Sequence, residues 1–375
     1  MKTHRVTCEV LAALLLVGTA SIARGAGRAK PRRQGDDKRN DYRVTILVSN
    51  EEGEAPHQDP DLRNAWGISA SSSSPWWVAN NASGTSSILD GDGNPAGPQK
   101  ITVPGAPTGT VFYGGTTSFQ LAMGAPARFL FASEDGTFSG WNPGVNPNAV
   151  VVHSEDGAIY KGLAIHGEVL YSTDFGSCEV EAFHGNFFDG TFEEFDTAGG
   201  FEDGSIPAGY CPFNVQAIGD SIFVTYAKRE GEDEAHGVGL GFVRQFDADG
   251  NLVAKVASHG LLNAPWGVAM APEDFGKFGG CLLVGNFGDG KINAYCQRGH
   301  GDEDANEAGD EHGGHDGWHH AGRLKQNRHT LVIDGLWGIG FGNDGAAGPR
   351  NVLYFAAGPD DEVNGYYGKV EFHRD

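Results

Sequence analysis

Short apolar runs recur along the whole chain, and glycine-rich turns separate them. The runs are rich in aromatic and β-branched residues, which favour strands over helices. No part of the chain body shows the spacing of apolar positions that indicates an amphipathic helix. The pattern therefore predicts an all-β protein.

One short sequence motif, or phrase, recurs several times along the chain. It reads NAWGIS at 64–69, NAPWGVAM at 263–270 and GLWGIGFG at 335–342. Looser copies, in which an aromatic residue or proline precedes the apolar run, begin at 107, 160 and 212. The six copies are spaced by roughly 50 residues, and such a period indicates a repeat architecture.

Each repeat continues in the same order after its opening phrase. A second apolar run, a glycine turn and a third run follow, and most third runs end on an aromatic residue. The second runs are 77–80, 129–133, 170–174, 222–226, 282–286 and 352–356. With a short fourth run, such as 100–103 or 150–153, each repeat has the four antiparallel strands of a propeller blade. We predict a six-bladed β-propeller.

The two ends of the repeat region complement each other. The last repeat has no fourth strand, because the chain ends after its third run, while residues 42–49 form an unused apolar run before the first repeat. We expect this N-terminal strand to close the last blade and to cover an otherwise exposed sheet edge. The propeller then spans 42–375, and its acidic, histidine-rich insertion at 299–320 is expected to be a flexible loop.

The first 41 residues do not fit the repeat. A basic start, a short apolar stretch and small residues at 21–23 predict a cleaved signal peptide over 1–23. A basic linker, expected to be disordered, follows at 24–41. We therefore expect a secreted protein, extracellular or periplasmic, with no membrane span.

Charge narrows the set of partners. Residues 1–40 hold nine of the 27 Lys and Arg residues but only three of the 49 Asp and Glu residues, which leaves a net charge of −28 (18 basic, 46 acidic) on the rest. Nucleic acid binding needs a basic surface and is not expected. The partner is expected to be a protein, a peptide or a glycan, and the chain a monomer.

Apart from Cys8, four cysteines remain, and an exported chain favours two disulfides. Cys281 and Cys296 lie at equal distances from the turn at 288–289, so they face each other across one hairpin. Cys178 and Cys211 then form the second bridge.

Candidate chemistry gathers at one rim of the channel. The first strand of each blade starts at this rim and the second strand returns to it, so the residues at those positions share one end of the propeller. They are Asn64, Trp66, Asn80, Glu134, Asp135, Lys161, Asp174, Asn214, Lys228, Asn263, Trp266, Asn286, Asp334 and Trp337. Amides and carboxylates beside tryptophans suit a peptide or a sugar.

Asn214 replaces the glycine found at this position of the other five repeats. With Glu134 and Asp174 it could form an oxygen-rich site for Ca²⁺ or Mg²⁺ in the central channel. The alternative is a structural role, in which Asn214 hydrogen-bonds a backbone group.

The sequences of these repeats are similar to those of a family of secreted bacterial six-bladed propellers with no established activity. The similarity is carried by 64–69, 134–141, 160–165, 212–216, 223–228, 263–269, 285–295 and 334–342. It implies the fold and export, and it covers almost all of the expected mature chain. More distantly the chain resembles NHL-repeat proteins and metal-dependent lactonases, a likeness of blade layout that does not fix function.

Three functions remain open at this point. The favoured one is a binding or scaffold module that recognises a protein, peptide or glycan on the rim without catalysis. The second is a metal-dependent, lactonase-like hydrolase with Glu134, Asp174 and Asn214 as ligands and Asp135 as base. The third is metal sequestration by the insertion, through His300, His312, His315, His319 and His320.

Overall fold

The computed structural model describes residues 40–98, 100–185, 192–297 and 317–373. Apart from two single 3₁₀ turns, Asn81–Ser83 and Gly276–Phe278, the regular elements in these ranges are β-strands. The predicted signal peptide (1–23), nearly all of the predicted linker (24–41) and most of the predicted loop (299–320) lie outside the described residues. No helix within the described ranges is long and apolar enough to cross a membrane.

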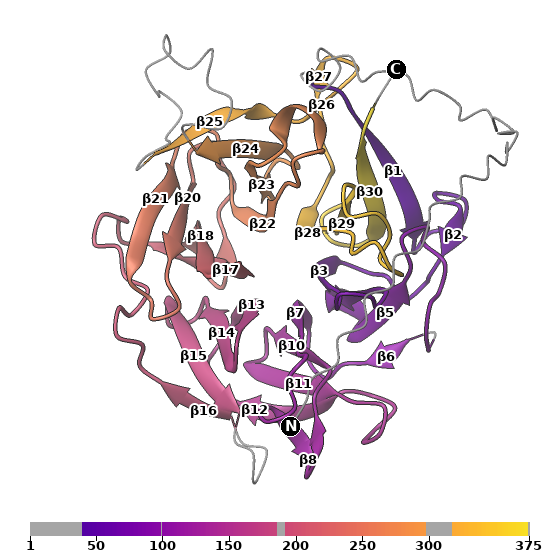
Figure 1. The fold of residues 1–375 in the computed structure, drawn as a ribbon, viewed down its shortest axis with the longest axis vertical. Coiled ribbons are helices and arrows are strands. Elements are labelled where there is room, and N and C mark those ends of the chain that lie inside the picture. Colours follow the sequence, from indigo (N-terminus) through magenta and orange to yellow (C-terminus); the bar gives the residue numbers. More distant parts are fainter. Residues whose placement is uncertain (1–39, 99, 186–191, 298–316, 374–375) are drawn as a thin grey trace, which may run out of the picture.

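Six sheets stand around a central axis, as Figure 1 shows. Four of them have four strands, and the other two have four strands and one short additional strand. Blades one and two comprise β3 (Ala65–Ser69), β4 (Trp76–Asn80), β5 (Thr85–Leu89) and β6 (Ile101–Thr102), then β7 (Pro107–Phe112), β10 (Phe129–Ser133), β11 (Thr137–Trp141) and β12 (Val150–Ser154). A small hairpin, β8 (Gln120–Ala122) with β9 (Ala125–Pro126), projects from blade two.

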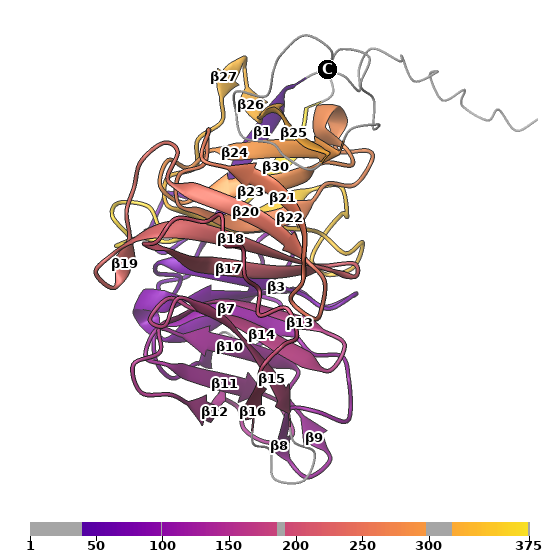
Figure 2. The same cartoon turned by 90° about the vertical axis from the view of Figure 1, so that its left-hand side faces the viewer.

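Blades three and four comprise β13 (Tyr160–His166), β14 (Val169–Asp174), β15 (Glu179–Gly185) and β16 (Phe192–Phe195), then β17 (Tyr210–Ile218), β18 (Ser221–Glu230), β20 (Gly241–Phe246) and β21 (Leu252–Ser258). In blade four β18 is extended by a short partner strand, β19 (Asp233–Glu234). Figure 2 shows β19 projecting beyond the stacked sheets.

Blades five and six comprise β22 (Pro265–Met270), β23 (Leu282–Asn286), β24 (Ile292–Gln297) and β25 (Trp318–Arg323), then β28 (Leu336–Phe341), β29 (Leu353–Ala357), β30 (Tyr366–Phe372) and β1 (Tyr42–Ser49). A short strand, β2 (His57–Gln58), runs parallel to β1 on its outer side, and β26 (Lys325–Gln326) pairs with β27 (His329–Thr330). The predicted six-bladed propeller is confirmed.

The N-terminal strand closes the ring as predicted. β1 pairs antiparallel with β30, from Tyr42 opposite Phe372 to Ser49 opposite Tyr366. The Tyr42 hydroxyl donates to the carbonyl of Phe275 at 2.9 Å, and its ring packs 4.9 Å from the Phe275 ring. This closure removes the unpaired edge that blade six would otherwise expose.

The recurring glycine has a steric cause. A Cβ atom added at Gly67 would lie 2.5 Å from the carbonyl oxygen of Thr108 in the next blade, and one at Gly267 would lie 2.5 Å from that of Trp337. The inner strands therefore approach one another too closely for a side chain at this position. The glycine of the repeated phrase is a packing requirement of the narrow channel.

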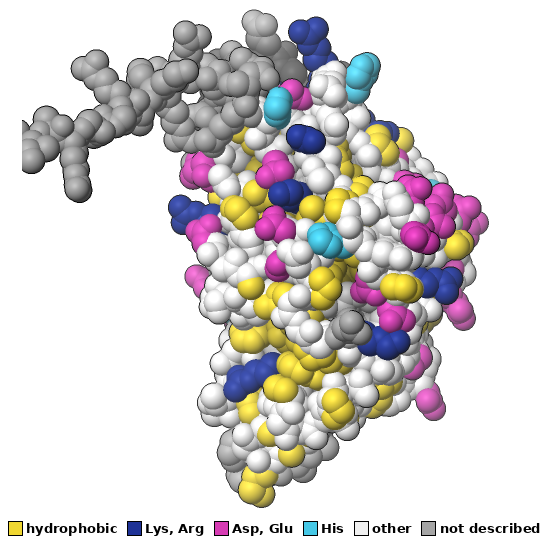
Figure 3. Space-filling model, turned by 90° about the vertical axis from the view of Figure 1, so that its right-hand side faces the viewer, with side chains coloured by type: hydrophobic (Ala, Val, Ile, Leu, Met, Phe, Trp, Pro, Cys, Tyr) yellow, Lys and Arg dark blue, Asp and Glu magenta, His cyan; other side chains and the backbone are white. Residues whose placement is uncertain are grey.

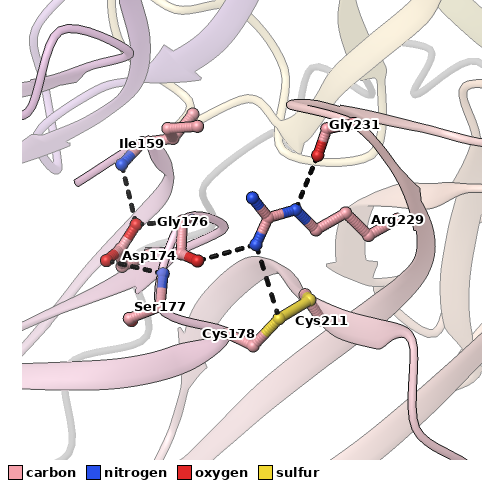
Figure 4. Close-up of a disulfide and its surroundings, with 8 residues drawn as sticks. All are labelled: Ile159, Asp174, Gly176, Ser177, Cys178, Cys211, Arg229 and Gly231. Atoms are coloured by element: carbon pink, nitrogen blue, oxygen red, sulfur yellow. Dashed lines mark hydrogen bonds between the residues drawn. A yellow bond between two sulfur atoms is a disulfide. The ribbon is translucent and has the colours of Figure 1, made fainter. Parts of the chain in front are cut away.

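Both predicted disulfides are present. Cys281 and Cys296 join the two strands of one hairpin in blade five, with their Cα atoms 4.4 Å apart. Cys178, in the turn after β14, joins Cys211 of β17, with Cα atoms 4.6 Å apart. Figure 4 shows this second bridge, which links blade three to blade four.

The predicted loop over 299–320 extends too far at its C-terminal end. Residues 318–320 lie in β25, where Trp318 is opposite Gln297 and His319 is opposite Cys296. The Trp318 side chain is buried and packs edge-on against Phe223. Burial of this indole and completion of the fourth strand of blade five outweigh the polar character of the two histidines.

Candidate functional site

Aromatic side chains close one end of the central channel. Trp337 stacks between Trp66 and Phe287, with ring centroids 3.7 Å apart on each side. Trp266 meets Trp66 and Trp337 edge-on, and all three indoles are at most 4% exposed. With Phe175 and Phe213 these rings form what we call the aromatic plug. The three predicted rim tryptophans thus lie together, but their faces pack against protein.

Lys161 lies directly over this plug. Its ammonium nitrogen is 5.1 Å from the Trp66 ring and 5.8 Å from the Phe175 ring, and the residue is 1% exposed. It pairs with Glu134 Oε1 at 2.5 Å and lies 3.7 Å from Asp233 Oδ1. Burial would lower the pKa of Lys161, but the charge and hydrogen bond of Glu134, helped by Glu234 and Asp233, raise it overall. The lysine therefore stays charged at neutral pH.

A chain of hydrogen bonds ties this lysine to three other blades. The Trp337 indole donates to Asn64 Oδ1 at 3.3 Å, and the Asn64 amide donates to Asn81 Oδ1 at 3.3 Å. The Asn81 amide then donates to Glu134 Oε2 at 2.8 Å. Glu134 is thus held at both oxygens, between blade one and blade three.

The blade-four hairpin (residues 228–240) lies across this end of the channel. Arg229 donates to the carbonyl of Gly176 in blade three at 2.6 Å (Figure 4). On the other side the Gly237 amide donates to Asn263 Oδ1 at 2.7 Å, and the His236 ring meets Phe287 edge-on. These tethers hold Asp233 near Lys161.

Carboxylates outnumber cations here. We call this group the acidic mouth: Glu134, Lys161, Asp233, Glu234, His236 and Glu362. Burial, and then the charges of Glu234 and Glu134, raise the pKa of Glu362 to about 7. The hydrogen bond to Glu234 raises the pKa of His236. Four carboxylates therefore face one lysine and one titratable histidine.

The backbone that carries Glu362 is strained. Asp360, Asp361 and Glu362 have φ angles of 57°, 53° and 66°, three consecutive left-handed residues that are not glycine. Each such residue costs of order 1 kcal/mol or more. Strain of this kind persists where the surrounding structure holds it, and it concentrates at functional sites.

Several other predicted rim residues point elsewhere. The Asn80 amide donates to Thr85 and Ser87 within blade one, and the Asn286 amide donates to the Leu261 carbonyl and to Asp289. Asp135 is exposed and accepts a hydrogen bond from Thr137. These contacts stabilise turns, which is the common use of such residues.

The three residues predicted to hold a metal each have protein partners. Asp174 accepts hydrogen bonds from the amides of Ile159, Gly176 and Ser177 (Figure 4). Asn214 of blade four donates to the carbonyl of Trp266 in the neighbouring blade five at 2.7 Å, the geometry of the structural alternative. Within the described ranges, no group of three or more His, Cys, Asp or Glu side chains is arranged to hold a metal ion.

Sequence reasoning did not identify Asp233, Glu234, His236 or Glu362. Their signal was present as two charged runs between strands, REGEDEAH at 229–236 and DDE at 360–362. Both runs lie in loops that extend from the blades over the channel. Rim residues were predicted only at the ends of the first and second strands of each blade, so the prediction did not include these loops.

Two proteins of Acanthamoeba polyphaga mimivirus are similar to this chain over most of its length. The uncharacterised protein R648 is 31% identical over 350 residues, which cover 88% of this chain and 80% of R648. The uncharacterised protein L690 is 30% identical over 357 residues, 88% of this chain and 85% of L690. The chain belongs to the family of these mimivirus proteins. These relatives are viral, so the expected bacterial origin is not supported. No family model matches the chain.

Solved structures of propeller shape are more distant. A streptogramin B lyase is 13% identical with a TM-score of 0.47, covering 88% of this chain and 97% of the lyase. A protein solved as a candidate gluconolactonase is 14% identical with a TM-score of 0.40, covering 71% of this chain and 88% of that protein. Neither likeness is close, and the fold assignment rests on the strand pairings described above.

Proposed function

We propose that this chain is an exported binding propeller that holds a positively charged segment of a peptide or protein at the acidic mouth, without catalysis. The observation that carries the proposal is the surplus of carboxylates around Lys161. The raised pKa of Glu362 reflects burial and repulsion by Glu234 and Glu134, which the charge of Lys161 offsets only in part. A bound lysine or arginine side chain would relieve this repulsion.

The surrounding surface supports a protein partner. Val238 of the blade-four hairpin is 64% exposed, and Val363, next to Glu362, is 55% exposed. Apolar side chains beside charges are common at protein interfaces. Figure 3 shows Asp and Glu side chains gathered along one edge of the molecule, with few Lys and Arg side chains among them. Export is supported by the two disulfides, which persist in oxidising compartments.

A glycan is less well supported than a peptide. Sugar rings stack on open aromatic faces, and Trp66, Trp266 and Trp337 are buried in the aromatic plug. The metal-dependent hydrolase is also less well supported, because Asp174 and Asn214 are committed to backbone groups.

Titration calorimetry with an eight-residue lysine-rich peptide tests the proposal. We expect one peptide per chain, with an affinity that falls about tenfold between 50 and 300 mM salt, because exposed charges are screened. A neutral peptide of equal length should not bind. Asp233→Asn and Glu362→Gln should each weaken binding about threefold or more at low salt.

The matched control is Asp220→Asn. Asp220 is an exposed acidic residue in the turn between β17 and β18, at the end of blade four opposite the acidic mouth. This variant removes the same charge and should bind the peptide as the natural chain does. Equal weakening in all three variants would mean that only the overall charge of the protein attracts the peptide, and the proposal would be wrong.

A further inference from the structure

A large cleft lies between blades three and four, away from the channel. Its walls are β15 and the end of β16 on one side and the connection over 196–208 on the other, and Tyr210, Pro212 and Tyr226 of blade four complete it. The volume that it offers to water-sized molecules is about 520 Å³. The Cys178–Cys211 disulfide fixes the two blades at one end of this cleft.

The wall of this cleft is acidic. Its six carboxyl groups belong to Glu179, Glu181, Glu194, Asp196, Glu202 and Asp203, and no Lys, Arg or His is among the described residues that line it. Asp203 is neutralised from outside by Arg244 at 2.6 Å and Lys255 at 3.6 Å. Arg229, near the disulfide, is committed to the carbonyls of Gly176 and Gly231 (Figure 4).

Glu181 is the feature that points to a ligand. It is only 6% exposed, yet it lines the cleft. Its Oε2 accepts a hydrogen bond from the Tyr160 hydroxyl at 2.9 Å, and no described residue donates a hydrogen bond to its Oε1. Burial without a cation favours the protonated form of this carboxyl group, and a cation bound in the cleft would favour its ionised form.

The titratable groups that surround Glu181 supply no positive charge to pair with it. Burial raises the pKa of Glu181 to about 8, and the negative charges of Asp174, Glu155 and Glu194 add to this, against the lowering effect of the Tyr160 hydrogen bond. His153 lies behind Tyr160, 3.5 Å from its hydroxyl, and burial lowers the pKa of this histidine. His153 is therefore neutral near pH 7 and supplies no positive charge.

The cleft also offers aromatic surface. Phe195 and Tyr210 are half-buried in its wall, beside the carboxylates. Aromatic faces attract organic cations and also pack against alkyl chains. A carboxylate at depth with aromatic sides suits an ammonium group on a flexible carbon chain better than a bare metal ion, which prefers several oxygen ligands at one point.

We propose that this cleft is a second binding site, for a primary ammonium group on an alkyl chain that pairs with Glu181. The group can come from a free polyamine or from a lysine side chain of a partner. The site is independent of the acidic mouth, so each of the two proposals can fail without the other.

Titration calorimetry of the full mature chain with spermidine, and separately with N-acetyl-lysine methylamide, tests this site at 150 mM NaCl. We expect one spermidine per cleft and a loss of about tenfold or more in affinity for Glu181→Gln, the usual cost of losing a hydrogen bond to a charged group. Glu194→Gln, which changes a more exposed wall residue, should weaken binding about threefold and serves if the buried variant does not fold.

The pH dependence provides a second readout. Near pH 7 most Glu181 groups carry a proton, and binding of a cation favours the ionised form. Affinity should therefore rise between pH 6 and 8 with release of a proton, which calorimetry in two buffers of different ionisation enthalpy detects. In Glu181→Gln this proton release should disappear.

Two outcomes support the proposal and identify the source of the ammonium group. Tighter binding of spermidine indicates a free polyamine, and equal or tighter binding of the lysine derivative indicates a partner side chain. Asp220→Asn, outside both the cleft and the acidic mouth, should leave both unchanged. Equal losses in all variants, displacement by millimolar MgCl₂ in every variant, or no binding of either probe would overturn the proposal.

Discussion

Lys161→Met is the change that most directly probes the electrostatics of the acidic mouth. Methionine keeps the unbranched apolar stem of lysine and removes its charged end. Breaking a buried ion pair costs about 3–5 kcal/mol because the remaining charge loses its partner. Glu134 is 28% exposed at its side chain and can regain water, so we expect the lower end, about 3 kcal/mol. This corresponds to a fall in melting temperature of roughly 6 °C.

The loss should depend on pH. The pKa of Glu362 is about 7, so this carboxyl is neutral at pH 5 and charged at pH 8. Lys161 has a raised pKa and stays charged at both values, so only the number of negative charges that it balances changes. We expect the cost of Lys161→Met to be about 1 kcal/mol smaller at pH 5 than at pH 8.

Urea unfolding followed by tryptophan fluorescence measures this cost, since three tryptophans lie in the aromatic plug. Lys100→Met is the matched control, because Lys100 pairs with Asp61 at 3.0 Å but is 51% exposed at its side chain. An exposed pair is worth at most about 1 kcal/mol. The reasoning would be refuted if Lys161→Met cost no more than Lys100→Met, or if its cost were the same at both pH values.

Three further changes test other parts of the structure. Arg244→Leu leaves the buried carboxylate of Asp203 without its 2.6 Å partner, so urea unfolding should show a loss of about 3–5 kcal/mol, partly recovered by adding Asp203→Asn. In the natural chain the pKa of Glu362 is about 7 in the folded state, above its unfolded value, so stability falls as the pH rises from about 4.5 to 7. Glu362→Gln removes this loss. The variant should therefore be about 1–2 kcal/mol more stable than the natural chain at pH 8, after allowance for solvent screening, and equal to it at pH 4. Cys281→Ser with Cys296→Ser opens a loop with a sequence separation of 15 residues, and thermal unfolding should show a loss of about 3 kcal/mol.

The fold could be predicted because its causes are local and repeated. Gly67 and Gly267 mark the close approach of inner strands, and the same phrase therefore recurs wherever a blade begins. The unused strand at 42–49 had to pair with the incomplete last blade. Cys281 and Cys296 followed from hairpin symmetry. Each of these inferences needed only the order of residues within one or two repeats.

The site could be predicted only in part, because it depends on how the blades converge. Glu134 and Lys161 were identified as rim residues, but their pairing depends on the spacing of blades two and three. The tryptophans were identified too, and their burial follows from the small diameter of the channel, which no single repeat encodes. Asn80 was predicted at the same rim, at the end of the second strand of blade one, but its side chain hydrogen-bonds Thr85 and Ser87 within that blade. Sequence alone does not show which of these competing contacts forms.

Hydrogen–deuterium exchange with the lysine-rich peptide tests the central claim most directly. The account predicts slower exchange in the blade-four hairpin (228–240) and around 360–364 when the peptide is added, with no change in the turn at 218–221 on the opposite end. Glu362→Gln should reduce this protection. Protection confined to other surfaces, or no protection at a peptide concentration that saturates binding, would contradict the assignment of the acidic mouth as the binding site.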